Sequence, residues 1–323
     1  MSKFDWKAAT RINTLMLKMV GLWPRGDGAY TFNVYTLYAF ISINLLVNGH
    51  TFFQAMNIFF VYSNLEALTA TIFVTSSEFL AAVKIYYYVQ NLKLLKKLKM
   101  YLDSDLFQPK SENQRLLVQP SLKMWRATYF GFWISSAATM TLWSVFPILD
   151  QTIKEYRLPF SAWYPYNTRM SPLYEITYIY QVMGIWFLAT ANLNIDTLIS
   201  ALMMYVGAQC EILCEELRTL KSDNSNIHEK IIMCIKHHQE VLDFAKGCNT
   251  FFDLMVLGQF FTSAMSNAVT MFRLTVVRPL SSEFYSLLFF VGSITTQLFL
   301  YCWFGNELEF KVRLNKTYDI ALL

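Results

Sequence analysis

Long apolar runs alternate with shorter polar stretches along the whole chain, and six of the runs are long enough to cross a bilayer. About 20 residues of helix span the roughly 30 Å of hydrocarbon in a membrane. The runs are continuous rather than alternating in polarity, which favours helices over a β-barrel. We therefore predict an all-α membrane protein with six transmembrane helices, at Val34–Met56, Leu65–Tyr88, Ala127–Leu149, Leu173–Tyr205, Phe251–Phe272 and Phe284–Phe304.

The composition agrees with this interpretation, since 54% hydrophobic and only 15% charged residues is too apolar for a soluble domain of 323 residues. No linker, repeat or low-complexity tract divides the chain. We predict a cytoplasmic N-terminal segment at 1–33, a membrane helical domain at 34–304 with cytoplasmic helix extensions near 206–250, and a cytoplasmic C-terminal tail at 305–323.

The positive charges predict the orientation. Of the 27 Lys and Arg residues, 21 lie before the first run, between the second and third, between the fourth and fifth, or after the sixth. The positive-inside rule then places both the N-terminus and the C-terminus in the cytoplasm. A seven-helix G-protein-coupled receptor has the opposite orientation.

Two basic segments lie next to predicted membrane helices. The first thirty residues are basic and carry no cleavable signal peptide, and they form either an amphipathic surface helix or a solvated leader. Lys93, Lys96, Lys97 and Lys99 follow the second run. Because orientation and anionic lipid account for such a cluster, we expect membrane lipid and not nucleic acid as its partner.

The polar stretch between the fourth and fifth runs predicts paired helices outside the membrane. The fourth run exceeds thirty residues, and the segment Ile227–Lys246 repeats an amphipathic helical pattern. Its apolar face predicts contacts with a neighbouring subunit, or alternatively packing within one chain. The residues that we expect to make subunit contacts are Ile231, Ile235, His238 and Leu242.

Several polar residues interrupt the apolar runs. Glu78 lies midway along the second run, where a carboxylate has to be neutral, paired or facing water. Either a functional role or an interhelical hydrogen bond accounts for it. Asn192 and Asp196 share one helical face. We expect Lys84 to extend its ammonium toward the inner membrane surface.

The predicted outer halves of the helices carry a mixture of aromatic, aliphatic and hydroxyl side chains. Cavities for small apolar ligands have this composition. Plain helix packing or lipid contact is the alternative. The candidate ligand-binding residues are Thr71, Val74, Thr75, Thr139, Trp143, Tyr178, Val182, Tyr285, Leu288 and Phe289.

No motif for catalysis occurs, so we predict neither an enzyme nor a cofactor. Cys210 and Cys214 are four apart and together with His237 or His238 contain zinc-ligand types. Ordinary packing faces are the simpler interpretation, and we predict no metal site.

Four segments resemble the insect odorant receptor family. They are GLWP (Gly21–Pro24), LPFSAWYPYNTRMSPLYEITYIYQ (Leu158–Gln181), CIKHHQEVLDFAKGCNTFFD (Cys234–Asp253) and QLFLYCWFGNEL (Gln297–Leu308). The resemblance implies an odorant receptor subunit in the plasma membrane of olfactory sensory neurons. It also implies a small volatile or semi-volatile organic ligand, bound among the outer halves of the second, third, fourth and sixth helices.

The resemblance further implies a tetrameric, ligand-gated cation channel with an obligate co-receptor subunit, a hetero-tetramer. The family pattern continues to a seventh, pore-lining helix, whereas this chain reads EFKVRLNKTYDIALL after Leu308. We therefore expect the ligand pocket to be present and the gate to be missing. The alternatives are a non-conducting truncated isoform or fragment, a small-molecule or ion transporter that uses Glu78, Asp196 and Lys84, and a membrane enzyme.

Overall fold

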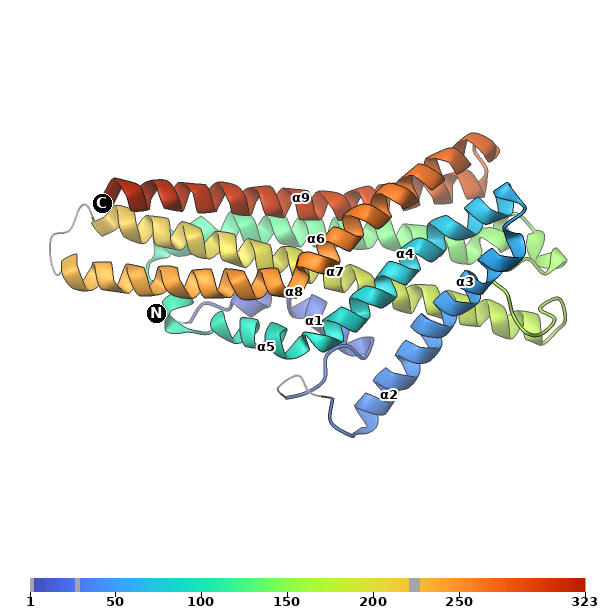
Figure 1. The fold of residues 1–323 in the computed structure, drawn as a ribbon, viewed down its shortest axis with the longest axis horizontal. Helices are drawn as coiled ribbons and strands as arrows, with labels where there is room; N and C mark the ends of the chain where they lie inside the picture. The colour runs from blue at the N-terminus through green and yellow to red at the C-terminus, as the bar shows by residue number, and fades with distance from the viewer. Residues whose placement is uncertain (1–2, 27–29, 221–226, 323) are drawn as a thin grey trace.

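The protein is a bundle of long helices (Figure 1), seen here in a computed structural model that describes residues 3–26, 30–220 and 227–322. No β-strand occurs within these ranges. Three short 3₁₀ turns lie at Trp6–Ala8, Asp105–Phe107 and Thr152–Glu155. The longer elements are α1 (Arg11–Met19), α2 (Val34–Ser42), the π-helix η2 (Ile43–Gly49), α3 (His50–Val61), α4 (Leu65–Gln90), α5 (Leu92–Tyr101), α6 (Glu112–Leu149), α7 (Leu173–Leu220), α8 (Ile227–Val276) and α9 (Ser282–Leu322).

Every predicted span lies on helix, but the helix boundaries differ from the expected ones. The first predicted span is divided among α2, η2 and α3, which follow one another without a loop. The last two spans belong to longer helices: α8 includes the expected extension at Ile227–Lys246, and α9 continues without a break through Phe304. A helix that leaves the membrane keeps its hydrogen bonds, so the apolar run alone does not mark its end.

Three helices of the described part of the chain are long and apolar enough to cross a membrane by length and composition. They are Leu65–Gln90, Leu173–Thr219 and Ser282–Arg313. The pieces of the first predicted span are each too short by themselves. The all-helical fold is therefore observed, while the count of six spans stays a prediction.

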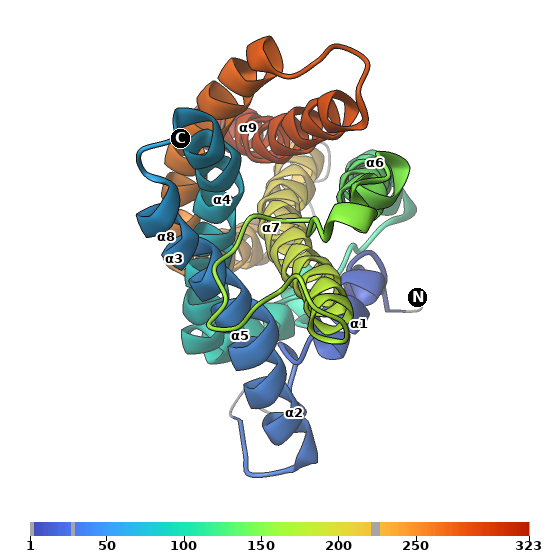
Figure 2. The ribbon, with the colours of Figure 1, turned by 90° about the vertical axis from the view of Figure 1, so that its right-hand side faces the viewer.

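Helix α7 occupies the centre of the bundle, with α4, α6, α8 and α9 around it (Figure 2). Its apolar stretch is 94% buried, whereas the corresponding stretches of α4 and α9 are less than half buried. A helix that is apolar on all sides is expected at such a central position. At one end of the molecule α7, α8 and α9 extend side by side (Figure 1).

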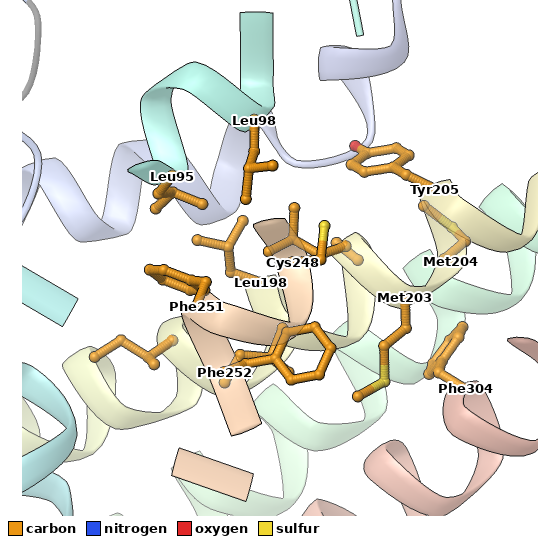
Figure 3. Close-up of a cluster of buried hydrophobic side chains, with 14 of the residues drawn as sticks. Leu95, Leu98, Leu198, Met203, Met204, Tyr205, Cys248, Phe251, Phe252 and Phe304 are labelled. Carbon is orange, nitrogen blue, oxygen red and sulfur yellow. The ribbon is translucent and has the colours of Figure 1, made fainter. Parts of the chain in front are cut away.

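The largest buried cluster joins α5, α7, α8 and α9 (Figure 3). Leu95 and Leu98 of α5 point into this cluster, where they meet Leu198 of α7 and Phe251 of α8. Successive buried leucines of α5 are three residues apart, which keeps them on one helical face. The opposite face of α5, which carries lysines, is left outside the core.

The N-terminal segment packs against α7 rather than lying free on a surface. Asn13 Nδ2 of α1 donates to Asn194 O at 2.7 Å and to Thr197 Oγ1 at 2.8 Å. Tyr205 OH donates to the carbonyl of the buried Trp6 at 2.9 Å. The segment is an amphipathic helix, as one of the two interpretations of the sequence held, with its buried face on α7 and basic residues outside.

Candidate functional site

A cavity of about 120 Å³ lies between α4, α6, α7, α8 and α9. Most of these helices contribute residues three or four positions apart, because such residues share one helical face. The cavity is therefore a property of the whole bundle rather than of one segment. Its lining residues are Val74, Ser77, Glu78, Leu80, Ala81, Phe132, Ser136, Thr139, Met140, Trp143, Ile185, Leu188, Ala189, Asn192, Leu193, Gln259, Phe290, Ser293, Ile294 and Gln297.

One end of the cavity is an aromatic wall centred on Trp143. Its ring centroid lies 5.2 Å from that of Phe290 and 5.4 Å from that of Phe160, with the Phe160 ring edge-on. Edge-on and tilted aromatic pairs at this spacing attract one another beyond their burial of surface. Phe160 belongs to the loop after α6, and Gln181 fixes its backbone through two hydrogen bonds of 3.0 Å. Phe160 therefore supports the Trp143 ring from outside this cavity.

A second cavity of about 90 Å³ lies on the loop side of the first. Val74 and Trp143 line both cavities and so stand between them. The second cavity is more polar: Arg273 forms an ion pair with Glu283, whose other carboxylate oxygen lies 3.8 Å from Arg157. The first cavity is called the inner cavity below and the second the outer cavity; Trp143 and Val74 separate the two.

The opposite end of the inner cavity is a polar floor. Asn192, Gln259 and Gln297 line it from three different helices. Gln259 Nε2 donates to Gln297 Oε1 at 2.8 Å, while the Lys84 ammonium donates to Gln259 Oε1 and to Asn192 Oδ1 at 3.2 Å. The amides of the floor are thus held by a cation buried beneath them.

The cation is neutralised by Asp196 of α7. Lys84 Nζ lies 2.6 Å from Asp196 Oδ1, and both side chains are fully buried. Tyr301 OH donates to the same oxygen at 2.6 Å, and Gln297 donates to Oδ2. The expectation that Lys84 extends to the membrane surface is wrong, because a carboxylate on the neighbouring helix pairs with its ammonium inside the bundle.

Glu78 makes the interhelical hydrogen bond that its sequence position suggested as one alternative. It lines the inner cavity, and its carboxylate accepts from Gln54 Nε2 at 2.9 Å and lies 3.1 Å from His50 Nδ1. Thr75 Oγ1 lies 3.4 Å from Gln54 Oε1. A buried carboxylate needs such partners, and here α3 supplies them.

The sequence model of a family described as 7tm Odorant receptor matches residues 64–313 of the chain. The chain belongs to the insect odorant receptor family. This family consists of receptors in membranes rather than of enzymes.

Two relatives of the receptor illustrate how distant the similarity is. The chain is similar to odorant receptor Or1 of Anopheles gambiae, with 22% identity covering 95% of this chain and 80% of that protein. It is also similar to odorant receptor 46a, isoform A, of Drosophila melanogaster, with 21% identity covering 66% of this chain and 56% of that protein. The first alignment extends over nearly the whole receptor.

Solved structures show the same fold. The insect olfactory receptor OR5 from Machilis hrabei matches with a TM-score of 0.83 and 19% identity, covering 96% of this chain and 83% of that chain. The structure of OR5 in complex with eugenol matches with a TM-score of 0.81 over the same shares. The helical arrangement of the receptor is therefore that of an olfactory receptor.

The receptor brings together four of the ten predicted ligand-binding residues. Val74, Thr139 and Trp143 line the inner cavity, while Thr71, Val74 and Trp143 line the outer one. Thr139 Oγ1 also lies 3.1 Å from Ser293 Oγ of α9. These positions come from α4 and α6.

Three further predicted residues lie near the cavities without lining them. Thr75 is buried beside Gln54. Tyr178 OH donates to Ser144 O at 2.6 Å and so ties α7 to α6. Val182 is half-buried on the same side of α7.

The predicted face of α9 is displaced by about one residue. Tyr285, Leu288 and Phe289 are each more than 40% exposed and do not line either cavity. Their neighbours Leu287, Phe290, Ser293, Ile294 and Gln297 face inward instead. A shift of one residue rotates a helical face by about 100°, so residues that adjoin in sequence point in different directions.

The sequence did not single out Gln259, Gln297 or Ser293 as site residues. A signal was available, since Ser293 and Gln297 are four apart on an otherwise apolar run. Polar groups on an apolar helix mark the face that turns toward a partner or a cavity.

The predicted subunit contacts lie on an uncovered surface of α8. Ile231, Ile235 and Leu242 are exposed and His238 is half-buried. His237, weighed as a zinc ligand, instead meets Glu216 at 3.2 Å and Gln209 at 3.1 Å. The described residues contain no group of three metal-ligand types close enough to hold an ion.

Proposed function

We propose that the chain is an odorant receptor subunit that binds a small organic ligand in the inner cavity. The observation that carries the proposal is the cavity itself, closed by aromatic rings at one end and by hydrogen-bonded amides at the other. Such a chamber suits a molecule with an apolar body and one hydrogen-bonding group. The proposed function is ligand binding, which requires no covalent chemistry.

The volume limits the size of the ligand. An apolar cavity of about 150 Å³ holds a molecule of the size of benzene. The inner cavity, at about 120 Å³, fits one ring or a short chain. A longer ligand has to move Trp143 and extend into the outer cavity, which shares that wall. We propose small volatile or semi-volatile compounds as the ligand class.

The relatives support this ligand class. OR5 of Machilis hrabei has been solved in complex with eugenol, a small aromatic molecule with a polar group. Transferred to this chain, an odorant of that kind places its ring against Trp143 and its polar group toward Gln259 and Gln297. The amide pair offers both donors and acceptors.

We further propose that the subunit acts with a co-receptor in a hetero-tetrameric, ligand-gated cation channel in the plasma membrane of olfactory sensory neurons. The apolar runs predict six spans, and the charge distribution predicts a cytoplasmic N-terminus. The exposed apolar face at Ile231, Ile235 and Leu242 supports subunit contact, with His238 at its edge.

Ligand binding changes helix positions only where it favours one arrangement over another. Ser293 of α9 lies 3.0 Å from Ser135 Oγ and 3.1 Å from Thr139 Oγ1 of α6, beside the cavity. A ligand that separates α6 from α9 breaks these contacts. We propose this pair of helices as the element that responds to the ligand.

The test compares Trp143→Ala with Tyr285→Ala, both co-expressed with a co-receptor subunit and challenged with a panel of small odorants. Removing the Trp143 ring takes away a wall, so half-maximal concentrations rise about tenfold for small ligands. Tyr285, which is 42% exposed, lines neither cavity, and its variant keeps the original ligand order. Unchanged responses of Trp143→Ala at equal surface expression contradict the proposed site.

Direct binding to the purified chain separates the pocket from the channel. Ligand-dependent tryptophan fluorescence that persists when no current is evoked identifies a subunit that binds without conducting. Current that depends on the substrate gradient, without channel openings, identifies a transporter.

A further inference from the structure

A basic pocket of about 690 Å³, distinct from the two cavities described above, opens between α1, the loop after it and α5. The N-terminal side of this pocket is basic, with Lys7, Arg11, Lys18 and Arg25 in its lining. These residues are held in place because α1 packs on α7 through Asn13. The wall is therefore part of the folded bundle rather than a loose terminal segment.

Helix α5 forms the other wall with Lys93, Lys96, Lys97 and Lys99. Its leucine face is fully buried in the core, so the remaining face carries the lysines to the pocket (Figure 3). None of the described residues that line the pocket is acidic. Eight positive side chains thus surround one concave space.

The ring of Trp23 and the backbone carbonyls after it hold two of the lysines in the middle of the pocket. The ammonium of Lys99 lies 4.7 Å from the ring centroid of Trp23, and that of Lys96 lies 5.6 Å from it. Lys96 Nζ donates to the carbonyls of Pro24 at 2.5 Å and Gly26 at 2.6 Å. Cations over an aromatic face and on carbonyls keep fixed positions. Two of the lysines are therefore preorganised.

Two acidic side chains form ion pairs with basic residues of the pocket lining. Lys7 forms an ion pair with Asp103, and Arg11 lies 2.9 Å from Asp5. Lys99 is the most buried lysine of the pocket, and burial, followed by the charge of Lys7, lowers its pKa to about 8. A bound anion brings negative charge among these clustered cations and is attracted to them.

The pocket lies where helices enter the membrane. Lys93–Lys99 follow directly on α4, the apolar span that ends at Gln90, while Trp23–Gly26 precede the start of α2 at Val34. Met19 and Met100 beside the pocket are about 60% exposed and apolar. A site with phosphate-binding cations and an exposed apolar margin matches a lipid headgroup with its acyl chains.

We propose that this pocket binds the headgroup of a membrane lipid that carries several phosphate groups on one ring, a phosphoinositide. Eight cations around one space favour clustered phosphates over the single charge of a common anionic lipid. The placement at the inner leaflet rests on the orientation given above. The site is separate from the odorant cavity, with which it shares no lining residue.

The test uses the purified full-length chain in phosphatidylcholine nanodiscs, titrated with short-chain phosphatidylinositol 4,5-bisphosphate and followed by native mass spectrometry. We expect one lipid to bind, with phosphatidylserine at least tenfold weaker. The double variant Lys93→Gln, Lys97→Gln removes two exposed charges from the pocket and weakens binding about tenfold to thirtyfold.

The matched control is Lys123→Gln, Lys236→Gln, which removes two exposed lysines elsewhere and leaves binding within twofold. Equal losses in both double variants, or equal binding of phosphatidylserine, overturn the proposal. So does soluble inositol trisphosphate that binds as tightly as the lipid, because the site then recognises a free phosphate compound. The lipid-binding measurement needs no odorant, so its result does not depend on whether the inner cavity binds one.

Discussion

Lys84 Nζ donates a hydrogen bond of 2.6 Å to Asp196 Oδ1, although the two residues are 112 positions apart and neither side chain is exposed. The pair joins α4 to the central α7, and through Tyr301 and the amides of Gln259 and Gln297 it extends to α8 and α9. The polar floor of the inner cavity belongs to this network. The same residues thus hold the bundle together and shape the site.

The Lys84–Asp196 pair makes its two residues interdependent. We expect Asp196→Asn and Lys84→Met each to destabilise the receptor by about 3–5 kcal/mol, because each leaves a buried charge without its partner. The double variant recovers a large part of that loss, since both charges are gone. Melting temperature and monodisperse yield in detergent measure the effect. Additive losses in the double variant contradict a coupled pair.

Gly184 makes room for the His50 ring that holds Glu78. A Cβ at position 184 would lie 2.5 Å from His50 Cδ2 and 2.9 Å from its Cγ. Gly184→Ala therefore displaces the ring and destabilises the receptor by about 1–3 kcal/mol. Gly292→Ala on α9 is the matched control, because nothing lies within 4 Å of its added Cβ. The control is neutral or raises stability by roughly 0.5–1 kcal/mol; similar melting temperatures of the two variants refute the steric argument.

Phe290 and Phe289 test the register of α9. Phe290 is 7% exposed and faces Trp143 in the inner cavity, whereas Phe289 is 43% exposed. Phe290→Ala enlarges the cavity, so responses shift toward bulkier odorants and stability falls by about 3 kcal/mol. Phe289→Ala changes neither the ligand order nor the core packing. Concentration–response curves over a size-graded odorant series measure this, and a larger effect of Phe289→Ala favours the register expected from sequence.

Lys99 gives the receptor a pH-dependent stability. Burial first, and then the charge of Lys7, lowers its pKa from 10.5 to about 8, against the opposing effect of Asp103. The unfolded chain therefore binds one more proton than the folded chain between pH 8 and 10.5, so stability rises with pH across that window. Below pH 8 Lys99 is protonated in both states, and the full free-energy cost of burying its charge lowers the stability of the folded receptor.

Lys99→Met removes this titration while keeping an apolar stem of similar length beside Thr14 and Trp23. From pH 7 to pH 10, the free energy of unfolding of the unaltered receptor rises relative to that of the variant by at most about 3 kcal/mol. Melting temperatures of the two proteins over this pH range measure the difference. A constant difference between the two proteins over this range shows that Lys99 does not titrate there.

The sequence by itself determined the helical class and much of the local structure. Apolar runs longer than a bilayer, and leucines three apart in α5, specify helices and their buried faces without knowledge of neighbours. Val74, Thr139 and Trp143 were candidate residues from the sequence, and in the structure all three line the inner cavity. Three of the four segments that carried the resemblance to odorant receptors lie within the family match at residues 64–313, while Gly21–Pro24 lies before it.

Only the tertiary structure decided which polar groups meet and where free volume remains. Lys84 was expected at the membrane surface, because a single helix offers its ammonium no partner; Asp196 becomes one only when α7 packs beside α4. The rotation of α9 that turns Phe290 inward and Phe289 outward is likewise set by packing against α6 and α7. Periodicity places residues on a common face of one helix, but a cavity is what remains between several helices, and its shape depends on all of their rotations together.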